Sequence, residues 1–552
     1  TTVIAAVSRF DDVILDVNPV SPYRPDIVLA MKQRHPGMRA IAYVLAGDYY
    51  PDLDADSLNQ IPTLIYRMLR HVDGFLYDRN TGLPIDQQGT NLARKDALGR
   101  FIVADSLAIL LRDHVIAAGI WDGIFTDIFP HTVGWIQNGT GIVIDYARAG
   151  YPSLAALDLA WSQAADTLAS RLRADGGPNF VLIGNSGLSA EHAWYNGWMR
   201  EDFPFQEGGT WYSNMLTDPQ GYFADDRDFQ PAPHNFIFSA WDGTANPYDA
   251  ANTRSARYGL ASAALGESYA CFGPPDKNSN TAPYQNWWYD EYGVDVASGR
   301  ASASATSTHW LGRAVNDHYQ MIWVGTNPDA SANPGFDAGT SGWSFSSFSP
   351  AVASFGQDTT TSAVGRGSGH VRITTASTVD WHVSVTTTGT IPMTPGLDYA
   401  ATFWCKASPP RVLHLVAYNS GGGAFVQVDS TWRQYQAIVT TGAPNGAVQL
   451  AFWLGTEAGD VWLDDVHFQQ GATSLYRRDF QNGSVLVNPA DATLTVPLGR
   501  PFQRILGVAD PVVNNGATAS SVTVPARDAV FLISTERDSI PPAAVTDLRA
   551  GP

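Results

Sequence analysis

Short apolar segments alternate with amphipathic helical patterns over the first 313 residues of this 552-residue chain. Eight segments read as strands buried on both faces, at residues 13–15, 40–45, 74–77, 123–125, 180–183, 194–199, 235–240 and 268–272. Helical spacing is clearest at Val103, Leu107 and Leu111, before a stop at Gly119. The alternation predicts a (β/α)8 barrel over residues 1–313, with an open doubly wound sheet as the alternative. A nucleotide-binding version of that open sheet is disfavoured, because no Gly-rich phosphate loop follows the first strand.

Carboxylates stand at or just beyond many of the predicted strand ends. The fourth strand, in the stretch IWDGIFTDIFP, is followed by Asp127, and Glu201 follows the sixth. Glycoside hydrolysis needs one carboxylic acid to protonate the leaving oxygen and a second carboxylate as nucleophile or base. We therefore predict that Asp127 and Glu201 are the catalytic pair, with their carboxyl groups within about 10 Å of each other. The alternatives are that Asp127 caps the next element and that Glu201 is an exposed residue paired with Arg200.

The neighbours of the two acids suggest their roles. Trp198 and Phe203 lie near Glu201 in the sequence, whereas His131 lies near Asp127. Apolar rings disfavour an ionised carboxyl group, and hydrogen-bond donors favour it. We therefore predict that Glu201 is the general acid and Asp127 the nucleophile or base.

Polar and aromatic residues near the same strand ends are candidates for sugar binding. The chain contains 17 Trp, 22 Tyr and 24 Phe, and flat aromatic faces suit stacking on sugar rings. The predicted substrate-binding residues are Asp48, Asp78, His131, Asn185, Asp202, Trp241, Asp242, Tyr269, Trp287, Trp288, Tyr289 and Glu291. For the aromatic run at residues 287–289, the alternative is that the rings pack the loop onto the barrel.

Other chemistries are disfavoured. There is no HExxH motif or His pair at ligand spacing, and no GxSxG elbow of an esterase. A net charge of −19 repels phosphate backbones, and no apolar run approaches the length of about 20 residues that spans a membrane. We expect a polysaccharide or oligosaccharide substrate, no cofactor for catalysis, no nucleic-acid partner and no membrane insertion.

Four motifs in the first region, DGIFTD, IGN, NGWMRED and WWYDEYG, together resemble a hypothetical glycosyl hydrolase family described as family-15-like. The resemblance covers most of residues 1–313 and implies a (β/α)8 barrel that hydrolyses sugar polymers. It places Asp127 and Glu201 at the acidic positions of that family. Two departures, Asn196 in place of the usual Asp and Ile128 where Asn is frequent, leave the substrate open.

From residue 333 the pattern changes to short strands separated by turn signals, which is typical of a sandwich or jelly roll. The blocks NPGFDAGTSGW, VDWHVSV, GLDYAATFWCKA, STWRQYQAIV and DVWLDDVHF resemble a family 4/9-type carbohydrate-binding module, which we expect over residues 329–471. The resemblance implies a structural calcium ion, with Asp337 and Asp465 at the acidic positions. Trp381, Tyr418 and Trp453 are candidates for the sugar-binding face, although strand alternation also allows core positions for each.

Residues 314–328 and 472–535 are predicted to form a C-terminal β-sandwich that the module interrupts, since insertions at surface turns are tolerated. Residues 536–552 resemble a linker and the first strand of a fibronectin type III domain. We therefore expect the natural protein to continue and this chain to be a truncated or processed form. No signal peptide is visible, and we expect a secreted glycoside hydrolase. The alternative is a non-catalytic carbohydrate-binding scaffold.

Overall fold

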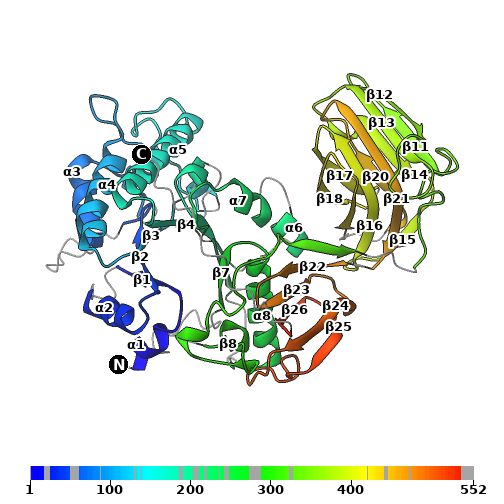
Figure 1. Ribbon diagram of the computed structural model, residues 1–552. Helices are drawn as coiled ribbons and strands as arrows, with labels where there is room; N and C mark the ends of the chain where they lie inside the picture. Colours follow the sequence, from blue (N-terminus) through cyan, green and yellow to red (C-terminus); the bar gives the residue numbers. More distant parts are fainter. Residues whose placement is uncertain are drawn as a thin grey trace, which may run out of the picture.

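The computed structural model is shown in Figure 1. It describes residues 2–17, 25–49, 61–86, 89–129, 132–138, 140–185, 190–201, 203, 210–216, 221–234, 236–240, 246, 248–272, 287–322, 327–418, 420–439, 445–471 and 474–535.

A parallel sheet of seven strands organises the first region. The strands are β1 (Asp12–Asp16), β2 (Arg39–Leu45), β3 (Gly123–Asp127), β4 (Val181–Asn185), β5 (Gly197–Glu201), β6 (Phe236–Ala240) and β7 (Ser268–Phe272). They lie in chain order, each parallel to the next. Their carboxyl ends therefore share one edge of the sheet.

The predicted (β/α)8 barrel is wrong. Among the described residues the sheet has seven strands, and no backbone pairing joins β7 to β1. The predicted third strand lies outside it, because Phe75 and Tyr77 form antiparallel bridges with Thr90 and Pro84. This segment satisfies its backbone groups locally, so β2 pairs directly with β3, with Ile41 opposite Gly123.

A side-chain hydrogen bond, rather than backbone strand pairing, connects β2 to β7. The Arg39 guanidinium donates to Asp12 Oδ1 at 2.7 Å and to the Tyr269 hydroxyl at 2.6 Å. Arg39 and Asp12 are the first residues of β2 and β1. Tyr269, predicted to bind substrate, therefore lies at the amino ends of the strands, away from the edge that carries Asp127.

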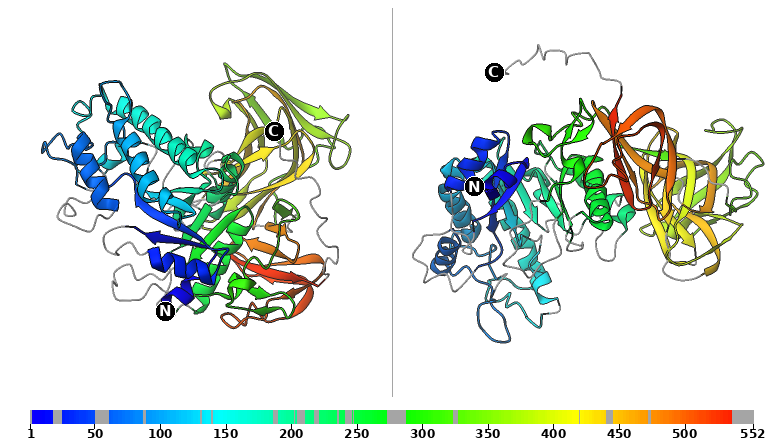
Figure 2. Two further views of the ribbon diagram at one scale, coloured as in Figure 1. Left: turned by 60° about the vertical axis from the view of Figure 1, so that its left-hand side comes forward. Right: turned by 90° about the horizontal axis from the view of Figure 1, so that it is seen from below.

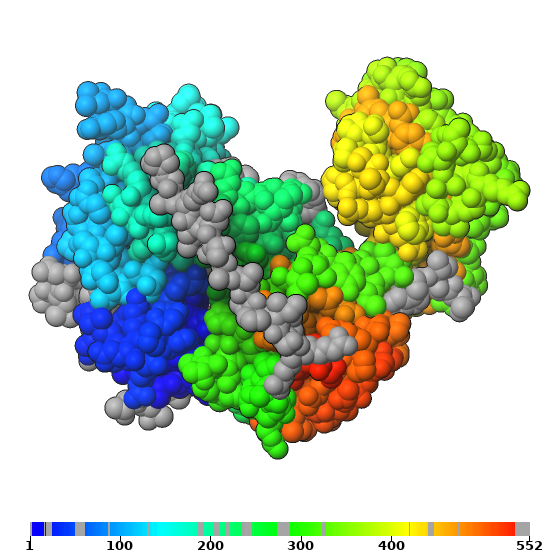
Figure 3. Space-filling view, viewed as in Figure 1, coloured from blue at the N-terminus to red at the C-terminus, as the bar shows by residue number. Residues whose placement is uncertain are grey.

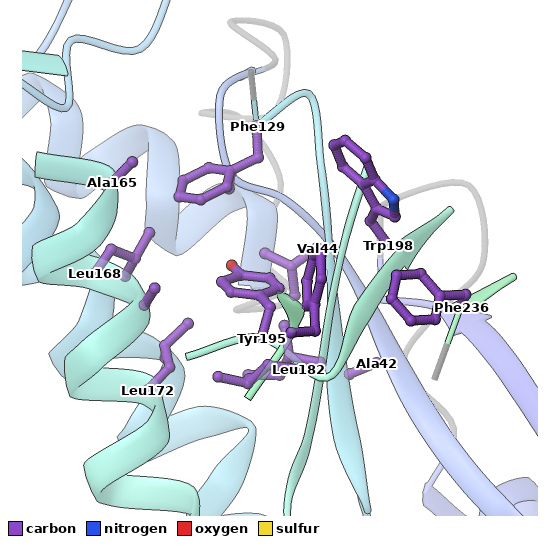
Figure 4. Packing of buried hydrophobic residues seen from close by; sticks show 14 of the residues in the cluster. Ala42, Val44, Phe129, Ala165, Leu168, Leu172, Leu182, Tyr195, Trp198 and Phe236 are labelled. Carbon is purple, nitrogen blue, oxygen red and sulfur yellow. The ribbon is translucent and has the colours of Figure 1, made fainter. Parts of the chain in front are cut away.

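Helices cover one face of the sheet (Figures 1 and 2). They are α2 (Pro25–Arg34), α3 (Ile61–Val72), α4 (Ile102–His114), α5 (Leu154–Gly176) and α8 (Ala250–Ala264). Among the shorter helices, α1 (Thr2–Val7) contacts α2, and α6 (Trp211–Leu216) contacts α7 (Tyr222–Asp228). Helix α5 begins after Ser153, whose Oγ accepts the backbone N–H of Ala156, and it ends at Gly177, which has a φ of +78°. Leu168 and Leu172 of α5 pack towards Leu182 in β4 (Figure 4).

The two faces of the sheet contain different residues, because successive side chains of a strand point to opposite sides. Ala42 and Val44 of β2 belong to the helix-covered core. Ile41 and Tyr43 belong instead to a second apolar cluster with Phe125. This second face continues at the carboxyl ends of the strands into polar side chains.

The strands from β11 to β21 form two antiparallel sheets, which we call the module. They are β11 (Trp343–Ser347), β12 (Val352–Asp358), β13 (Ser368–Thr375), β14 (Val383–Thr387), β15 (Ile391–Met393), β16 (Tyr399–Ser408), β17 (Arg411–Tyr418), β18 (Gly422–Val428), β19 (Arg433–Val439), β20 (Asn445–Trp453) and β21 (Gly459–Gln470). One sheet has the order β11-β14-β20-β17-β18, with β15 also paired to β20, and the other β12-β13-β21-β16-β19. A core that includes Phe403, Leu415 and Phe452 lies between them.

The short strands β8 (Val294–Asp295) and β9 (Arg300–Ala301) form a separate two-stranded sheet. The other strands form one six-stranded antiparallel sheet, which we call the C-terminal sheet. Its order is β10 (Tyr319–Ile322), β22 (Ser474–Asp479), β23 (Gly483–Asn488), β26 (Asp528–Ser534), β24 (Leu494–Arg504) and β25 (Thr518–Val524). Because β10 precedes the module in sequence and pairs with β22 after it, the module interrupts this sheet. The C-terminal sheet lies between the parallel-sheet region and the module (Figure 2), and the module projects from the rest of the molecule (Figure 3).

The predicted C-terminal β-sandwich is also wrong, since the described strands make a single sheet. Helix α8 takes the place of a second sheet, and its Tyr258 and Ala261 share a core with Val485 and Phe531. Arg257 of α8, only 1% exposed, binds Asp528 of β26 through Nη2 at 2.7 Å. A buried ion pair therefore joins the parallel-sheet region to the C-terminal sheet.

Candidate active site and glycan-binding face

The predicted acids meet at the carboxyl ends of neighbouring strands. Asp127, Asn185 and Glu201 are the last residues of β3, β4 and β5. Asn185 Nδ2 donates to Asp127 Oδ1 at 2.8 Å and to Glu201 Oε1 at 3.3 Å. Two oxygens that share one amide nitrogen at these distances are at most about 6 Å apart. The structure thus places both carboxyl groups at one site and inserts an amide between them.

Three donors hold the Asp127 carboxylate. Its Oδ2 accepts the hydroxyl of Tyr43 on β2, and its Oδ1 accepts the backbone N–H of Ile128 at 2.8 Å in addition to the Asn185 amide. Tyr43 stacks on Phe125, with ring centroids 5.6 Å apart and planes inclined by 18°. An ionised carboxylate is an acceptor only, so this set of donors matches it.

The backbone is strained directly after Asp127. Ile128 has a φ of +48°, a left-handed conformation that a β-branched residue rarely adopts. A Cβ at Gly47 would lie 1.9 Å from the carbonyl oxygen of Ile128, so only glycine fits there. Ala46 N–H also donates to the carbonyl of Asp127 at 3.0 Å. Such strain costs about 1–3 kcal/mol, persists only where the surroundings enforce it, and is concentrated at functional sites.

The surroundings of Glu201 differ from those we predicted. Glu201 is exposed, whereas Trp198 is buried and donates its indole N–H to Asp225 at 3.0 Å. Arg200 forms its ion pair with Asp225 and lies over the ring of Phe203. Residues 198 and 200 share one face of β5 and residue 201 the other, so the rings expected around Glu201 lie behind it. If Glu201 is the general acid, it acts because a substrate can reach its exposed carboxyl group, and not because an apolar pocket encloses it.

Asp48 and Asp78 each accept hydrogen bonds from backbone N–H groups. Asp48 is buried after β2 and accepts the N–H of Tyr49 at 2.6 Å. Asp78 lies in an exposed turn, where the hydrogen bond from the Val143 N–H lowers the pKa of its carboxyl group. His131, Asp202, Trp241 and Asp242 lie outside the described residues.

The aromatic run after the predicted eighth strand packs the loop onto the protein. Trp287 and Tyr289 are buried in a cluster with Phe272. Trp288 donates its indole N–H to the carbonyl of Ser302 at 3.0 Å.

Glu291 is also buried, and it accepts from Asn514 Nδ2 of the C-terminal region at 2.8 Å. Burial raises the pKa of Glu291, while the nearby charge of Arg257 opposes the rise. We therefore replace the prediction of sugar subsites at residues 287–291 with a packing role.

The module has an aromatic row across three strands of one sheet. His414 of β17 lies opposite Trp453 of β20 and opposite Phe425 of β18. The His414 and Phe425 rings stack at 4.3 Å with planes 16° apart, and Trp453 meets His414 edge-on at 5.1 Å. Residues directly opposite each other in a sheet share a face, so these three rings line one outer surface.

The other predicted sugar-binding residues lie on or beside this row. Tyr418 is four residues beyond His414 on β17, so the two side chains lie on the same side of the strand. Tyr418 is 45% exposed. Trp381, also 45% exposed, lies in the short 3-10 helix Asp380–His382, and Asp380 Oδ2 binds His414 Nδ1 at 2.6 Å. Sequence reasoning missed His414 and Phe425, although the alternation in RVLHLVAY marks the outward position of His414.

The two residues predicted to bind calcium belong to different networks. Asp337 Oδ1 accepts the backbone N–H of Arg366 at 2.5 Å. Asp465 Oδ1 binds His467 Nε2 at 3.0 Å, and Asp329 Oδ2 binds the other ring nitrogen at 2.6 Å. Burial alone would lower the pKa of His467, but hydrogen bonds and charges from Asp329 and Asp465 raise it to about 9.

The raised pKa favours a protonated, positively charged His467 ring beside Asp465. Within the described ranges, no group of three or more His, Cys, Asp or Glu side chains is arranged to hold a metal ion. Ligation of calcium by Asp337 and Asp465 stays a prediction, because backbone carbonyl oxygens can also supply ligands.

Comparisons with known proteins identify the module. Residues 329–460 match the family model CBM_4_9, a carbohydrate binding domain. This match confirms the predicted type of module and supports polysaccharide binding by it. It covers less than half of the chain. No curated protein matches the chain.

Solved structures similar to part of the chain include one described as "CBM4 structure and function". It is 21% identical, with 25% of this chain and 97% of that chain covered and a TM-score of 0.21. The second N-terminal cellulose-binding domain of Cellulomonas fimi β-1,4-glucanase C is 17% identical, with coverages of 27% and 99% and a TM-score of 0.22. TmCBM61 in complex with β-1,4-galactotriose is 16% identical, with coverages of 26% and 99% and a TM-score of 0.18.

Proposed function

We propose that this protein is a secreted glycoside hydrolase whose module binds the polysaccharide that its parallel-sheet region cleaves. One observation carries the proposal: a single amide, Asn185 Nδ2, contacts the carboxylates of both Asp127 and Glu201. Two carboxyl groups at this separation can flank a glycosidic bond, one giving a proton to the leaving oxygen and the other acting at the anomeric carbon. The strain at Ile128, next to Asp127, supports a functional role for the same position.

The two acids have distinct tasks in this mechanism. Asp127, held by hydrogen-bond donors from Tyr43, Ile128 and Asn185, acts as the ionised carboxylate. Glu201 is exposed at the same edge of the sheet and acts as the acid that reaches the glycosidic oxygen.

The module contributes by holding the enzyme on its polymer. Its aromatic row, His414, Trp453 and Phe425 with Tyr418 beside it, offers ring faces and edges for sugars. A bound module keeps the parallel-sheet region near many glycosidic bonds and raises their effective concentration. In the part of the chain that the structure describes, no helix has the length and apolar character needed to cross a membrane.

Release of reducing ends from a panel of polysaccharides tests the proposal. The unmodified chain should release them, whereas Asp127→Asn and Glu201→Gln should each lower the rate at least about 1,000-fold and leave the melting temperature within about 3 °C. A 2,4-dinitrophenyl glycoside needs little protonation as it leaves, so it should restore dinitrophenolate release by Glu201→Gln and fail with Asp127→Asn. The opposite rescue pattern would reverse the two roles.

A non-catalytic carbohydrate-binding protein is the second candidate. The observation that favours it is that the family match covers residues 329–460 and none of the parallel-sheet region. In that case the chain would bind a polysaccharide in affinity gel electrophoresis and release no reducing ends. Equal, background-level rates for the unmodified chain and for Asp127→Asn would establish this alternative.

A further inference from the structure

We infer that hydrolysis retains the anomeric configuration, through a glycosyl ester on Asp127, and that Tyr43 is the positioning residue that holds this nucleophile. The inference rests on the proposed function and deepens it. Tyr43 was not among the candidates from the sequence, because its place on β2 is distant from Asp127 along the chain.

The separation of the carboxyl groups favours retention. An inverting enzyme keeps its two carboxyl groups about 6.5–9.5 Å apart to leave room for a water molecule, whereas a retaining enzyme holds them about 5–5.5 Å apart. The shared Asn185 amide limits the facing oxygens of Asp127 and Glu201 to at most about 6 Å.

The contacts of Asp127 are those of a fixed nucleophile. The Tyr43 hydroxyl binds one carboxylate oxygen, and the N–H groups of Ile128 and Asn185 bind the other. The stack of Tyr43 on Phe125 restrains the phenol, and β2 and β3 are direct neighbours with Tyr43 opposite Phe125. A carboxylate held at both oxygens loses little freedom when it attacks, which lowers the barrier for the bonding step.

The reaction then proceeds in two balanced steps. An Asp127 oxygen bonds to the anomeric carbon as the glycosidic C–O bond breaks, and Glu201 gives its proton to the departing oxygen. The Glu201 carboxylate next takes a proton from water, the water oxygen bonds to the anomeric carbon, and the ester C–O bond to Asp127 breaks. Each step inverts the anomeric carbon, so the product keeps the original configuration, and one water is consumed.

Product stereochemistry is the first test. Proton NMR of the full chain acting on a panel of α- and β-linked polysaccharides and 2,4-dinitrophenyl glycosides should show that the first sugar released has the anomeric configuration of the substrate. Hydrolysis with the opposite configuration would overturn this inference and leave the proposed function standing. If the chain hydrolyses no member of the panel, the inference and the proposed function both fail.

A covalent trap is the second test. The 2-deoxy-2-fluoro glycosyl fluoride of the hydrolysed sugar should inactivate the chain, and mass spectrometry should find the adduct on the peptide that contains Asp127. An adduct on Glu201, or hydrolysis without inactivation, would contradict the assignment. With azide present, Glu201→Gln should form a glycosyl azide of retained configuration and Asp127→Gly one of inverted configuration.

Tyr43→Phe tests the positioning role, with Tyr195→Phe as the matched control. The Tyr195 hydroxyl is buried and lies 2.9 Å from Thr126 Oγ1, one residue from Asp127 but on the other face of the sheet. Tyr43→Phe should lower kcat and the trapping rate about 10- to 1,000-fold while KM stays within about threefold. Tyr195→Phe should leave kcat within about threefold, although it also loses a hydrogen bond. Equal effects of the two variants on kcat, or a Tyr43→Phe change confined to the melting temperature, would show a merely structural role.

Discussion

Ile128 connects backbone geometry to the candidate site. Its N–H donates to Asp127 Oδ1, and its left-handed conformation directs its carbonyl towards Gly47, where only a glycine leaves room for it. A β-branched residue does not adopt this conformation without enforcement. Gly47, Ala46 and Ile128 therefore position Asp127 through the backbone, independently of Tyr43 and Asn185.

Gly47→Ala tests this arrangement. The added Cβ meets the backbone oxygen of Ile128 at 1.9 Å, and a backbone atom cannot move aside as a flexible side chain does. We expect a loss of about 2–4 kcal/mol in the free energy of unfolding and a fall of at least about 10-fold in reducing-end release.

Thermal denaturation and the polysaccharide assay measure the two effects. Gly356→Ala is the control, because a Cβ there has no atom within 4 Å. Wild-type behaviour of Gly47→Ala in both measurements would remove the link between this strain and the site.

At the scale of secondary-structure elements, side chains that alternate along each strand point to opposite faces of a sheet. This alternation separates candidate sugar-binding side chains from side chains that pack against their neighbours. In the module, Trp453 lies on the outer face of one sheet beside His414 and Phe425. Trp462 lies on the other sheet, where His370 stacks parallel on it at 4.6 Å and Lys406 Nζ approaches its ring at 4.7 Å. The ring of Trp462 is thus already covered by its neighbours.

Trp453→Ala should weaken binding of the module's polysaccharide about 10- to 100-fold, because an aromatic contact of about 1–3 kcal/mol is lost. Trp462→Ala, the matched control, should change binding by no more than about twofold. Affinity electrophoresis of the full chain in gels that contain each polysaccharide measures both. A larger loss of binding for Trp462→Ala than for Trp453→Ala would show that the binding face lies on the other sheet.

At the scale of the whole molecule, contacts between the module and the C-terminal sheet determine how the parts are joined. Ala400 and Ile438 of the module belong to the same apolar core as Leu475 and Leu486 of the C-terminal sheet. Beside this core, Asp491 N–H donates to Asp398 Oδ2 at 3.0 Å, and Asp398 N–H donates to Asp491 Oδ2 at 3.3 Å. Two carboxylates of like charge therefore face each other where the module joins the rest of the chain.

This pair predicts a pH-dependent stability. Burial, with a further contribution from the charge of Asp491, raises the pKa of Asp398 to about 6, and the more distant charge of Arg527 opposes the rise. The phenols of Tyr212 and Tyr258 also face Asp398. The folded state then binds a proton more tightly than the unfolded state, in which an Asp titrates near about 4. Its contribution to stability is present below about pH 4 and is lost as the pH rises to about 6.

Asp398→Asn should remove this dependence and, at pH 7.5, raise the free energy of unfolding by about 1–3 kcal/mol. Melting temperatures at pH 4.5 and 7.5 measure the difference in slope between the variant and the unmodified chain. The control is Asp429→Asn, because Asp429 forms an exposed ion pair with Arg433. It should change the dependence of the melting temperature on pH very little. An Asp398→Asn variant that is less stable than the unmodified chain at pH 7.5 would contradict the prediction.

Much of the local structure could be predicted from the sequence. Seven of the eight predicted strands in the first region correspond to β1–β7, and Ser153 and Gly177 flank α5 as capping signals indicate. Asp127 and Glu201 could be named because a carboxylate after a short apolar run marks the end of a buried strand. The type of the module followed from the order of its motifs, and the family match confirms it. These features depend on residues that are near one another in the sequence, so they can be recognised without knowledge of the fold.

The remaining features depend on contacts between residues far apart in the chain. Whether residues 74–77 join a sheet depends on competition between β3 and the nearby Thr90 and Pro84 for the same backbone groups. Burial of Glu291 requires the C-terminal region, and burial of the rings at residues 287 and 289 requires Phe272, and no local pattern specifies these contacts. Tyr43 reaches Asp127 only because β2 and β3 are neighbours, across 84 positions of sequence. Local propensity thus determined where strands begin and end and which side chains follow them. Strand pairing and packing determined which of those side chains meet. That outcome depends on free energies summed over the whole fold.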